Sequence, residues 1–200
     1  GIPICATLNV CVAQAISVAE AYERGRKVAL EKGIRPAPCF AVQQVGRIDD
    51  YLRDVASDMK LGLPEEVITM AGIAIAKRSY KIFEERGYHA RIMPAGLRGH
   101  YHLAELAGAN VTFSITTRVQ DMVLAADPPR EVRIDKPVDP EILKKLMQIP
   151  EFVRAYEPDG LTMPEYITFG VMQKLLSQFM ETGWKPLETY KTGRTSQRWI

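Results

Sequence analysis

One segment, residues 89–115, constrains the fold more than any other part of the chain. Its sequence is HARIMPAGLRGHYHLAELAGANVTFSI. Residues 90–93 and 111–115 have the apolar character of strands, residues 94–99 the composition of a turn, and residues 101–107 that of a short helix. Two strands joined by a helix pair in parallel, with a right-handed crossover between them. The segment therefore predicts a parallel α/β fold.

Arginines follow two of the predicted strands. Arg98 lies in the turn of this segment, and Arg47 follows the apolar run of residues 39–45. Residues just past the carboxyl end of a strand face the ligand-binding side of an α/β sheet or barrel. Two converging guanidinium groups suit a phosphate or another oxyanion, because each can donate two parallel hydrogen bonds. The alternative is a pair of surface ion pairs, in which Arg47 would contact Asp49 or Asp50.

Charge and hydropathy exclude several classes of function. Hydrophobic residues make up 46% and charged residues 25% of the chain, which is typical of a folded globular protein. The 26 basic and 24 acidic residues are spread along the chain, so no basic stripe predicts nucleic-acid binding and no polybasic arm predicts membrane binding. The longest nearly uninterrupted apolar stretch, residues 68–76, is far shorter than the ~20 residues of a membrane-spanning helix. We therefore expect neither a nucleic acid nor a membrane as a partner.

Cysteine and histidine usage predicts reduced thiols and no metal site. Cys5, Cys11 and Cys39 lie in or beside apolar segments without CxxC spacing, which favours buried thiols in a cytoplasmic setting. His100 and His102 are two residues apart on a predicted helix, so they point to different faces, and no third ligand is in register. A Walker loop, a GxSxG motif and a GxGxxG motif are all absent. We expect neither a metal nor an organic cofactor.

The first half of the chain alternates strands and helices. Strands are predicted over residues 2–12 and 39–45, and helices over residues 12–33 and 63–87. We expect Asp49 or Asp50 to cap a helix that begins near Tyr51. Lys77 and Lys81, on the long helix, are expected to be solvated.

Beyond residue 125 the composition changes. Residues 126–138 contain three prolines among charged residues, which predicts a linker. Asp139 starts a predicted helix, and Thr162 and Glu165 form a capping box ahead of a further helix that runs to about residue 181.

These elements amount to about four strands, each followed by a helix, and then an all-helical tail. Four parallel strands cannot close a barrel, which requires eight. The chain is therefore expected to be half of a barrel or a small open sheet. We expect residues 1–125 to form this α/β part and residues 126–200 to form a linker with a helical C-terminal extension.

Three stretches resemble one known family. They read TLNVCVAQAISVAEAYERGRKVAL (residues 7–30), CFAVQQVGRIDDYL (39–52) and SYKIFEERGYHARIMPAGLRGHYHLAELAGANVTFSI (79–115). In order and spacing they resemble the second half of transaldolase and its fructose-6-phosphate aldolase relatives. The segment IPEFVRAYEPDGLTMPEYITFG (149–170) also resembles the tail of longer bacterial transaldolases.

The resemblance implies a (β/α)₈ or TIM barrel, in which a lysine on the fourth strand forms a Schiff base with the donor keto-sugar. A dihydroxyacetone unit then passes to an aldose phosphate, which is a transferase reaction of carbohydrate metabolism. Thr7 matches the fifth-strand threonine that helps to hold the catalytic water. Arg47 and Arg98 match the two arginines that bind the substrate phosphate. Without the resemblance, Thr7 would be interpreted as a hydroxyl bonded to backbone.

Four positions near these residues depart from the family pattern. They are Cys5, where the family usually has asparagine, Val42 and Gln44, where it has a serine and an aromatic residue, and Gly96, where serine is frequent. The resemblance places Cys5, Gln44 and Gly96 in the substrate site. The amide of Gln44 could hold a water or a sugar hydroxyl. The departures bear on water handling and donor specificity.

The Schiff-base lysine of the family has no counterpart in this sequence, which starts at the fifth strand of the pattern. The first residue is glycine, so we expect an upstream part to have been removed. We expect a phosphate-binding half-barrel that is inactive alone, binds a sugar phosphate, and associates with itself or with a complementing N-terminal half. The alternatives are a non-catalytic half-barrel that binds a phosphosugar or assembles with a partner, and an unrelated small α/β binding domain.

Overall fold

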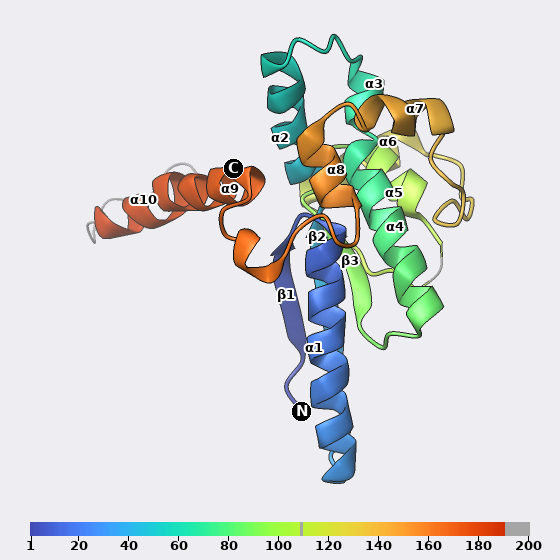
Figure 1. The fold of residues 1–200 in the computed structure, drawn as a ribbon, viewed down its shortest axis with the longest axis vertical. Helices are drawn as coiled ribbons and strands as arrows, with labels where there is room; N and C mark the ends of the chain where they lie inside the picture. Colours follow the sequence, from blue (N-terminus) through green and yellow to red (C-terminus); the bar gives the residue numbers. More distant parts are fainter. Residues whose placement is uncertain (109, 191–200) are drawn as a thin grey trace.

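The fold is built on a small parallel sheet, and the computed structural model describes residues 1–108 and 110–190. The three strands are β1 (Ile4–Asn9), β2 (Cys39–Gln44) and β3 (Arg91–Ala95), paired in the order β1-β2-β3. Helix α1 (Val12–Glu31) connects β1 to β2, and α4 (Ala71–Arg86) precedes β3 (Figure 1). All strand pairs are parallel, with Ile4 beside Cys39 and Phe40 beside Arg91. The predicted α/β class is confirmed.

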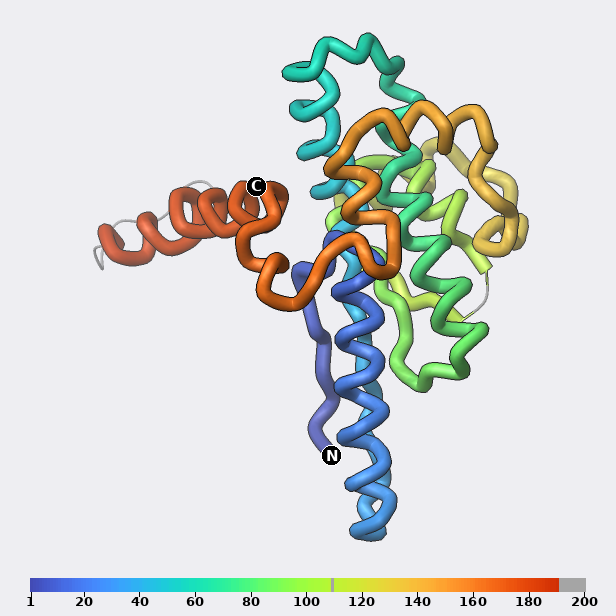
Figure 2. Tube along the Cα trace, viewed as in Figure 1, coloured from blue at the N-terminus to red at the C-terminus, as the bar shows by residue number. Residues whose placement is uncertain are grey.

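The remaining helices follow the sheet in chain order. They are α2 (Val45–Asp58), α3 (Glu65–Ile68), α5 (His100–Leu106), α6 (Thr117–Ala126), α7 (Pro140–Leu146), α8 (Pro150–Tyr156), the 3-10 helix η1 (Met163–Glu165), α9 (Gly170–Phe179), the π-helix η2 (Met180–Trp184) and α10 (Lys185–Glu188). Figure 2 shows the segment from α9 to α10 as an arm that projects from the rest of the chain. No helix in the described residues has both the length and the apolar character that a membrane crossing requires.

Several predicted helix boundaries are wrong for local reasons. Helix α2 begins at Val45, directly after β2, so Asp49 and Asp50 lie inside the helix and cap nothing. The single helix predicted over residues 63–87 is divided into α3 and α4. At the break, the Thr69 hydroxyl donates to the Glu66 carbonyl over 3.3 Å, a local bond that competes with the regular helical pattern.

The cap predictions further along the chain are confirmed. Asp139 caps α7, its carboxylate accepting from the Glu141 N–H over 2.8 Å. Thr162 and Glu165 form the predicted capping box, although it opens the short helix η1 rather than α9 itself. The helix predicted to follow the box begins only at Gly170, in α9.

The fourth strand, predicted over residues 111–115, does not form within the described residues. The N–H groups of Thr112 and Ser114 do donate to the carbonyls of Ile92 and Pro94, over 3.3 and 3.0 Å. A parallel ladder also needs a return bond from the N–H of residue 94, between these two acceptors. Pro94 has no N–H, so the return bond cannot form and the pairing stays one-sided.

The C-terminal helices share the core of the α/β part. Phe152 of α8 and Leu146 of α7 are fully buried in the same apolar cluster as Ile48 and Leu52 of α2. Phe169, just before α9, lies edge-on to the Tyr51 ring, with the ring centroids 6.3 Å apart. The helices after residue 126 and the α/β part before it therefore bury apolar surface against each other.

The three cysteines differ in environment. Cys11 and Cys39 are buried, as predicted, and burial raises the pKa of the Cys11 thiol to about 12. The Cys11 sulfur also accepts from the Gln14 N–H at the start of α1. Cys5 is exposed on β1, so the expectation of a buried thiol is wrong at that position.

Lys77 is buried, which contradicts the expectation of a solvated side chain. Its residue is 8% exposed, and its ammonium donates to the Glu105 carboxylate over 3.2 Å and to the carbonyls of Arg133 and Lys136 over 2.9 and 2.7 Å. Burial lowers the pKa of Lys77, and the Glu105 carboxylate opposes that shift. All three ammonium protons have acceptors. The side chain therefore fastens residues 133–136 to α4.

We predict that Lys77→Met lowers the free energy of unfolding by about 1–3 kcal/mol, because methionine retains the apolar stem but leaves two partly buried carbonyls and the Glu105 carboxylate without their donor. Lys81→Met is the matched control. Lys81 lies one turn further along α4, its side chain is 77% exposed, and its pairing with Glu85 spans 3.7 Å. Its substitution should change stability by no more than about 0.5 kcal/mol. Urea unfolding of both variants checks this, and equal midpoints would contradict the fastening role.

Candidate functional site

Five of the six residues of the predicted site lie at or just past the carboxyl half of the strands, and Cys5 lies nearer the start of β1. Cys5 and Thr7 are on β1, Gln44 ends β2, Arg47 is in the first turn of α2, and Gly96 and Arg98 follow β3. Because the three strands are parallel, their carboxyl ends meet at one edge of the sheet. This edge is the usual ligand-binding side of such sheets.

Helix α2 starts at this edge without a loop or a side-chain cap. Gln44 occupies the N-cap position, but its side chain makes no capping hydrogen bond. Its amide nitrogen instead donates to the Thr7 hydroxyl on the neighbouring strand over 3.3 Å. The first N–H groups of a helix have no acceptor within the helix, and they carry a partial positive charge. The start of α2 is therefore suited to an anion.

Gly46 and Gly96 allow the loop after β3 to lie directly against α2. A Cβ atom on Gly46 would stand 2.2 Å from the Gly96 carbonyl oxygen and 2.7 Å from Cγ of Arg98. Gly96 has a left-handed backbone, with φ of 65°, and a Cβ atom there would stand 2.7 Å from the Gln44 side-chain oxygen. The Gln44 amide thus occupies the space beside Gly96.

Arg98 is held at several points. Its Nε and one terminal nitrogen donate to the same Asp50 oxygen over 2.9 and 2.6 Å, and its other terminal nitrogen donates to the Gly96 carbonyl over 2.9 Å. Burial alone would raise the pKa of Asp50, but hydrogen bonds from Arg98 and Arg53 outweigh it, so the pKa is lowered. Asp50 is therefore a carboxylate that orients Arg98.

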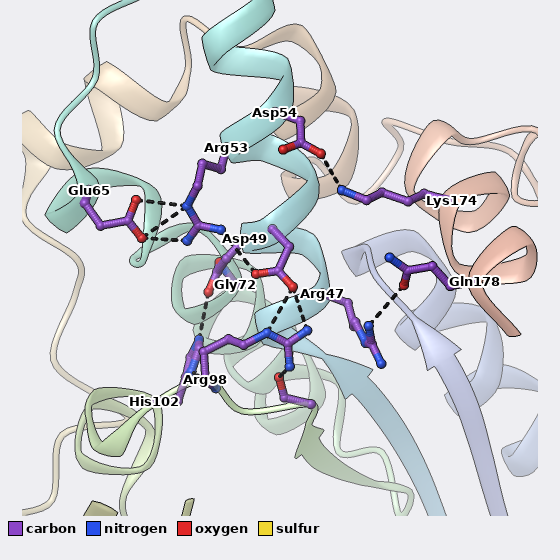
Figure 3. A network of polar contacts seen from close by, with 12 residues as sticks. Arg47, Asp49, Arg53, Asp54, Glu65, Gly72, Arg98, His102, Lys174 and Gln178 are labelled. Carbon is purple, nitrogen blue, oxygen red and sulfur yellow. Dashed lines mark hydrogen bonds and ion pairs between the residues drawn. The ribbon is translucent and has the colours of Figure 1, made fainter. Parts of the chain in front are cut away.

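Asp50 belongs to a chain of alternating charges on α2 and α3. Arg53 donates to the second Asp50 oxygen over 3.2 Å and also binds Glu65, with a shortest contact of 2.6 Å. Figure 3 shows Arg53, Glu65 and Arg98 in this arrangement. This row of four side chains contains two cations and two anions, so Arg98 adds no net charge to the site.

Arg47 has no carboxylate partner among residues 1–108 and 110–190. Its Nη1 donates to the amide oxygen of Gln178, on α9, over 3.1 Å (Figure 3). Lys174, one turn earlier on α9, forms an ion pair with Asp54 of α2. The alternative expectation, in which Arg47 pairs with Asp49 or Asp50, is wrong because those carboxylates have other partners. Arg47 is therefore an arginine of the site whose charge is not paired with a carboxylate in the described part of the chain.

Strand β1 is distorted next to Thr7. Leu8 has a left-handed backbone, with φ of 65°, and the register of β1 on β2 shifts between Ala6 and Asn9. The Asn9 amide spans the irregularity, donating to the carbonyls of Ala6 and Val42 over 2.7 and 3.1 Å. A left-handed conformation costs energy for a residue other than glycine, and such strain is frequent at functional sites. Thr7 is exposed at this point.

Asp49 and His102 form a buried pair behind Arg98, and both side chains are 0% exposed. The imidazole Nε2 lies 2.8 Å from one Asp49 oxygen, and the other oxygen accepts from the Gly72 N–H over 2.7 Å. His100, two residues earlier, is exposed, so the two histidines do face different environments. In the described residues, no group of three histidine, cysteine or acidic side chains is arranged to hold a metal.

Gly72 lets the start of α4 reach Asp49. A Cβ atom on Gly72 would stand 2.3 Å from the Val45 carbonyl oxygen and 2.8 Å from two further backbone atoms of that residue. Only glycine fits there, because the obstacle is backbone rather than a movable side chain. The close approach places the positive end of the α4 dipole at a buried carboxylate.

We predict that Gly72→Ala destabilises the protein by about 1–3 kcal/mol through overpacking alone, with a further loss if the hydrogen bond to Asp49 breaks. Gly25→Ala is the matched control, because Gly25 is also inside a helix and a Cβ atom there meets nothing within 4 Å. It should be neutral or stabilising by up to about 1 kcal/mol. Thermal unfolding compares the two, and equal melting temperatures would refute the close approach.

Two interactions of the site were not predicted from the sequence. Asp50 was expected to cap a helix start, and its contact with Arg98 was not expected. Gln178 lies 131 residues from its partner Arg47 in the sequence. The adjacent aspartates Asp49 and Asp50, one turn inside α2, were a usable signal for the contact with Arg98, because Asp50 can reach the turn that follows β3. No pattern in the sequence indicates Gln178.

A comparison with protein families finds a match over most of the chain. The model described as Transaldolase/Fructose-6-phosphate aldolase matches residues 1–162. The matched range contains β1, β2, β3 and all six residues of the predicted site, and it ends before α9. A search of curated proteins finds none that matches the chain.

Proposed function

Because the chain belongs to the transaldolase/fructose-6-phosphate aldolase family, we propose that it supplies the phosphate-binding half of an aldolase-type sugar-phosphate site. The proposed ligand is a phosphorylated keto-sugar or aldose. The observation that carries the proposal is the position of Arg47 and Arg98, which follow neighbouring parallel strands, with Arg47 in the first turn of a helix that has no side-chain cap.

The two arginines make different contributions in this proposal. Arg47 has a neutral partner, Gln178, so its charge is available to attract an anion. Arg98 is neutralised by Asp50, which fixes the plane of its guanidinium and leaves it as an oriented donor. Both can form charge-assisted hydrogen bonds to phosphate oxygens. The first N–H groups of α2, which have no acceptor within the helix, would complete the cradle.

The reacting end of the sugar would lie beside β1 and β2. Thr7 and Gln44 are already joined there by a hydrogen bond, so their hydroxyl and amide can hold one water or one sugar hydroxyl between them. Cys5 lies two residues before Thr7 on the same strand face. The covalent step requires a lysine inside the barrel, and none of the three strands carries a lysine. We assign that step to a strand that this sequence does not include.

We predict that Arg47→Ala and Arg98→Ala each weaken fructose 6-phosphate binding by about 1.5–3 kcal/mol, which is roughly ten- to a hundredfold. Each substitution removes a charge-assisted donor. Lysine at either position should restore only part of the affinity, because an ammonium lacks the planar fork. Calorimetric titration with fructose 6-phosphate, and with unphosphorylated fructose as the ligand control, measures the effect.

Arg130→Ala provides the control for non-specific charge loss. Its side chain is 91% exposed and pairs with Asp127, outside the proposed site. The Arg130→Ala variant should bind fructose 6-phosphate as tightly as the unmodified chain does. If the Arg47 and Arg98 variants bind fructose 6-phosphate as tightly as this control does, the site is not a phosphate site.

The proposed half-barrel needs a second half beside β1. Within the described residues, β1 pairs with β2 alone, whereas the outer edge of β3 receives bonds from Thr112 and Ser114. Ile2 and Ile4 are 84% and 52% exposed, and an apolar hollow of about 360 Å³ lies beside them between β1 and α1. Parallel sheets are normally covered on both faces. We propose that a complementing half, or a second copy of this chain, covers the β1 edge.

We predict that the chain associates, and that Ile4→Lys reduces the association, because a lysine on an edge strand opposes edge-to-edge pairing. Leu124→Lys is the control, since Leu124 is also apolar and is 78% exposed, but lies on α6. Sedimentation velocity over a range of concentrations gives the oligomeric state. A stable monomer at all concentrations, without a complementing half, would count against self-association.

A further inference from the structure

A buried, hydrogen-bonded pair of side chains holds the backbone of Arg98. Asp49 and His102 are both fully buried, with 2.8 Å between the carboxylate oxygen and Nε2, and the second ring nitrogen of His102 lies 3.1 Å from the Arg98 N–H. We propose that Asp49 and His102 are positioning residues that fix the Arg98 backbone so that its guanidinium can meet the substrate phosphate. The inference rests on the proposed function of Arg98.

The hydrogen bonds determine which ring nitrogen carries the proton. The Arg98 N–H can only donate, so Nδ1 of His102 must accept and is unprotonated. A neutral imidazole then carries its proton on Nε2, which donates to Asp49. The Arg98 N–H therefore donates to the ring, and the ring donates to the Asp49 carboxylate, so both hydrogen bonds run from the loop toward α2.

The carboxylate at the end of this connection is stabilised from a second side. Asp49 also accepts from the Gly72 N–H at the start of α4. Burial raises the pKa of Asp49, and the bonds from His102 and Gly72 oppose the shift. A buried carboxylate with its hydrogen bonds satisfied contributes little net stability compared with apolar packing, but it can select one arrangement of the chain. This arrangement places the Arg98 N–H at a fixed distance from α2.

Adjacent residues of α2 hold the two ends of Arg98. Asp49 acts on its backbone through His102, and Asp50 binds its guanidinium directly. Successive residues on a helix point in different directions, so one aspartate faces the core while the other faces the partly exposed site. The arginine is therefore fixed at both ends by a rigid element.

Two substitutions of His102 separate its two hydrogen bonds. The Asn side-chain oxygen lies as many bonds from Cβ as Nδ1 does, so His102→Asn can retain the acceptor for the Arg98 N–H while losing Asp49. The Gln amide nitrogen lies as many bonds from Cβ as Nε2, so His102→Gln can retain the donor to Asp49 while losing Arg98. The same pair of substitutions at the exposed His100 is the control.

The full chain is titrated with fructose 6-phosphate, and amide hydrogen exchange is measured over residues 96–99. We expect His102→Gln to lose about tenfold in affinity, which corresponds to about 1.4 kcal/mol, and to exchange faster in this loop. His102→Asn should retain affinity within about threefold although its global stability falls, because the Asp49 carboxylate is left without its ring donor. Both His100 variants should resemble the unmodified chain.

Each contrary result has a distinct meaning. If both His102 variants lose affinity in proportion to stability, the pair is only part of the core and the positioning role is refuted. If His102→Gln leaves exchange of the loop unchanged, the ring does not hold Arg98 and the role is again refuted. If the unmodified chain binds no fructose 6-phosphate, the proposed function fails, and the exchange measurement still decides whether His102 holds the loop.

Discussion

The arrangement of this protein depends on backbone-to-backbone contact on two sides of α2. The loop after β3 lies against Gly46, and the start of α4 lies against Val45 where Gly72 removes the side chain. Without these two contacts, neither Arg98 nor the Gly72 N–H could reach its aspartate on α2. The absence of two side chains therefore determines the positions of the charged ones. Packing in the interior is close enough that one methyl group would displace an element.

The charged side chains around α2 orient one another more than they stabilise the fold. The side chains of Glu65, Arg53, Asp50 and Arg98 are about one third to three fifths exposed, and exposed pairs contribute only ~0–1 kcal/mol each. Their value is geometric, because an arginine shared between fixed acceptors has few accessible rotamers. Asp49 differs in being fully buried, where losing a partner would leave an uncompensated charge.

The sequence predicted the parallel sheet, two of the caps and the clustering of the site at the strand ends, because these depend on short-range patterns. It did not predict Lys77, whose partners lie on α5 and in residues 133–136, because periodicity cannot distinguish a buried lysine with three acceptors from an exposed one. The fourth strand was predicted from its own apolar run, yet its pairing depends on Pro94 of its neighbour. Partner identity is a property of the fold and is not encoded in local periodicity.

The bond between Arg47 and Gln178 has a consequence for the order in which the protein is made. Gln178 follows Arg47 by 131 residues in the sequence. A ribosome therefore releases the arginine long before the helix that covers it. During that interval the Arg47 guanidinium lacks its glutamine partner, so a dissolved anion can bind it first. Helix α9 then competes for the arginine with any anion that has bound it.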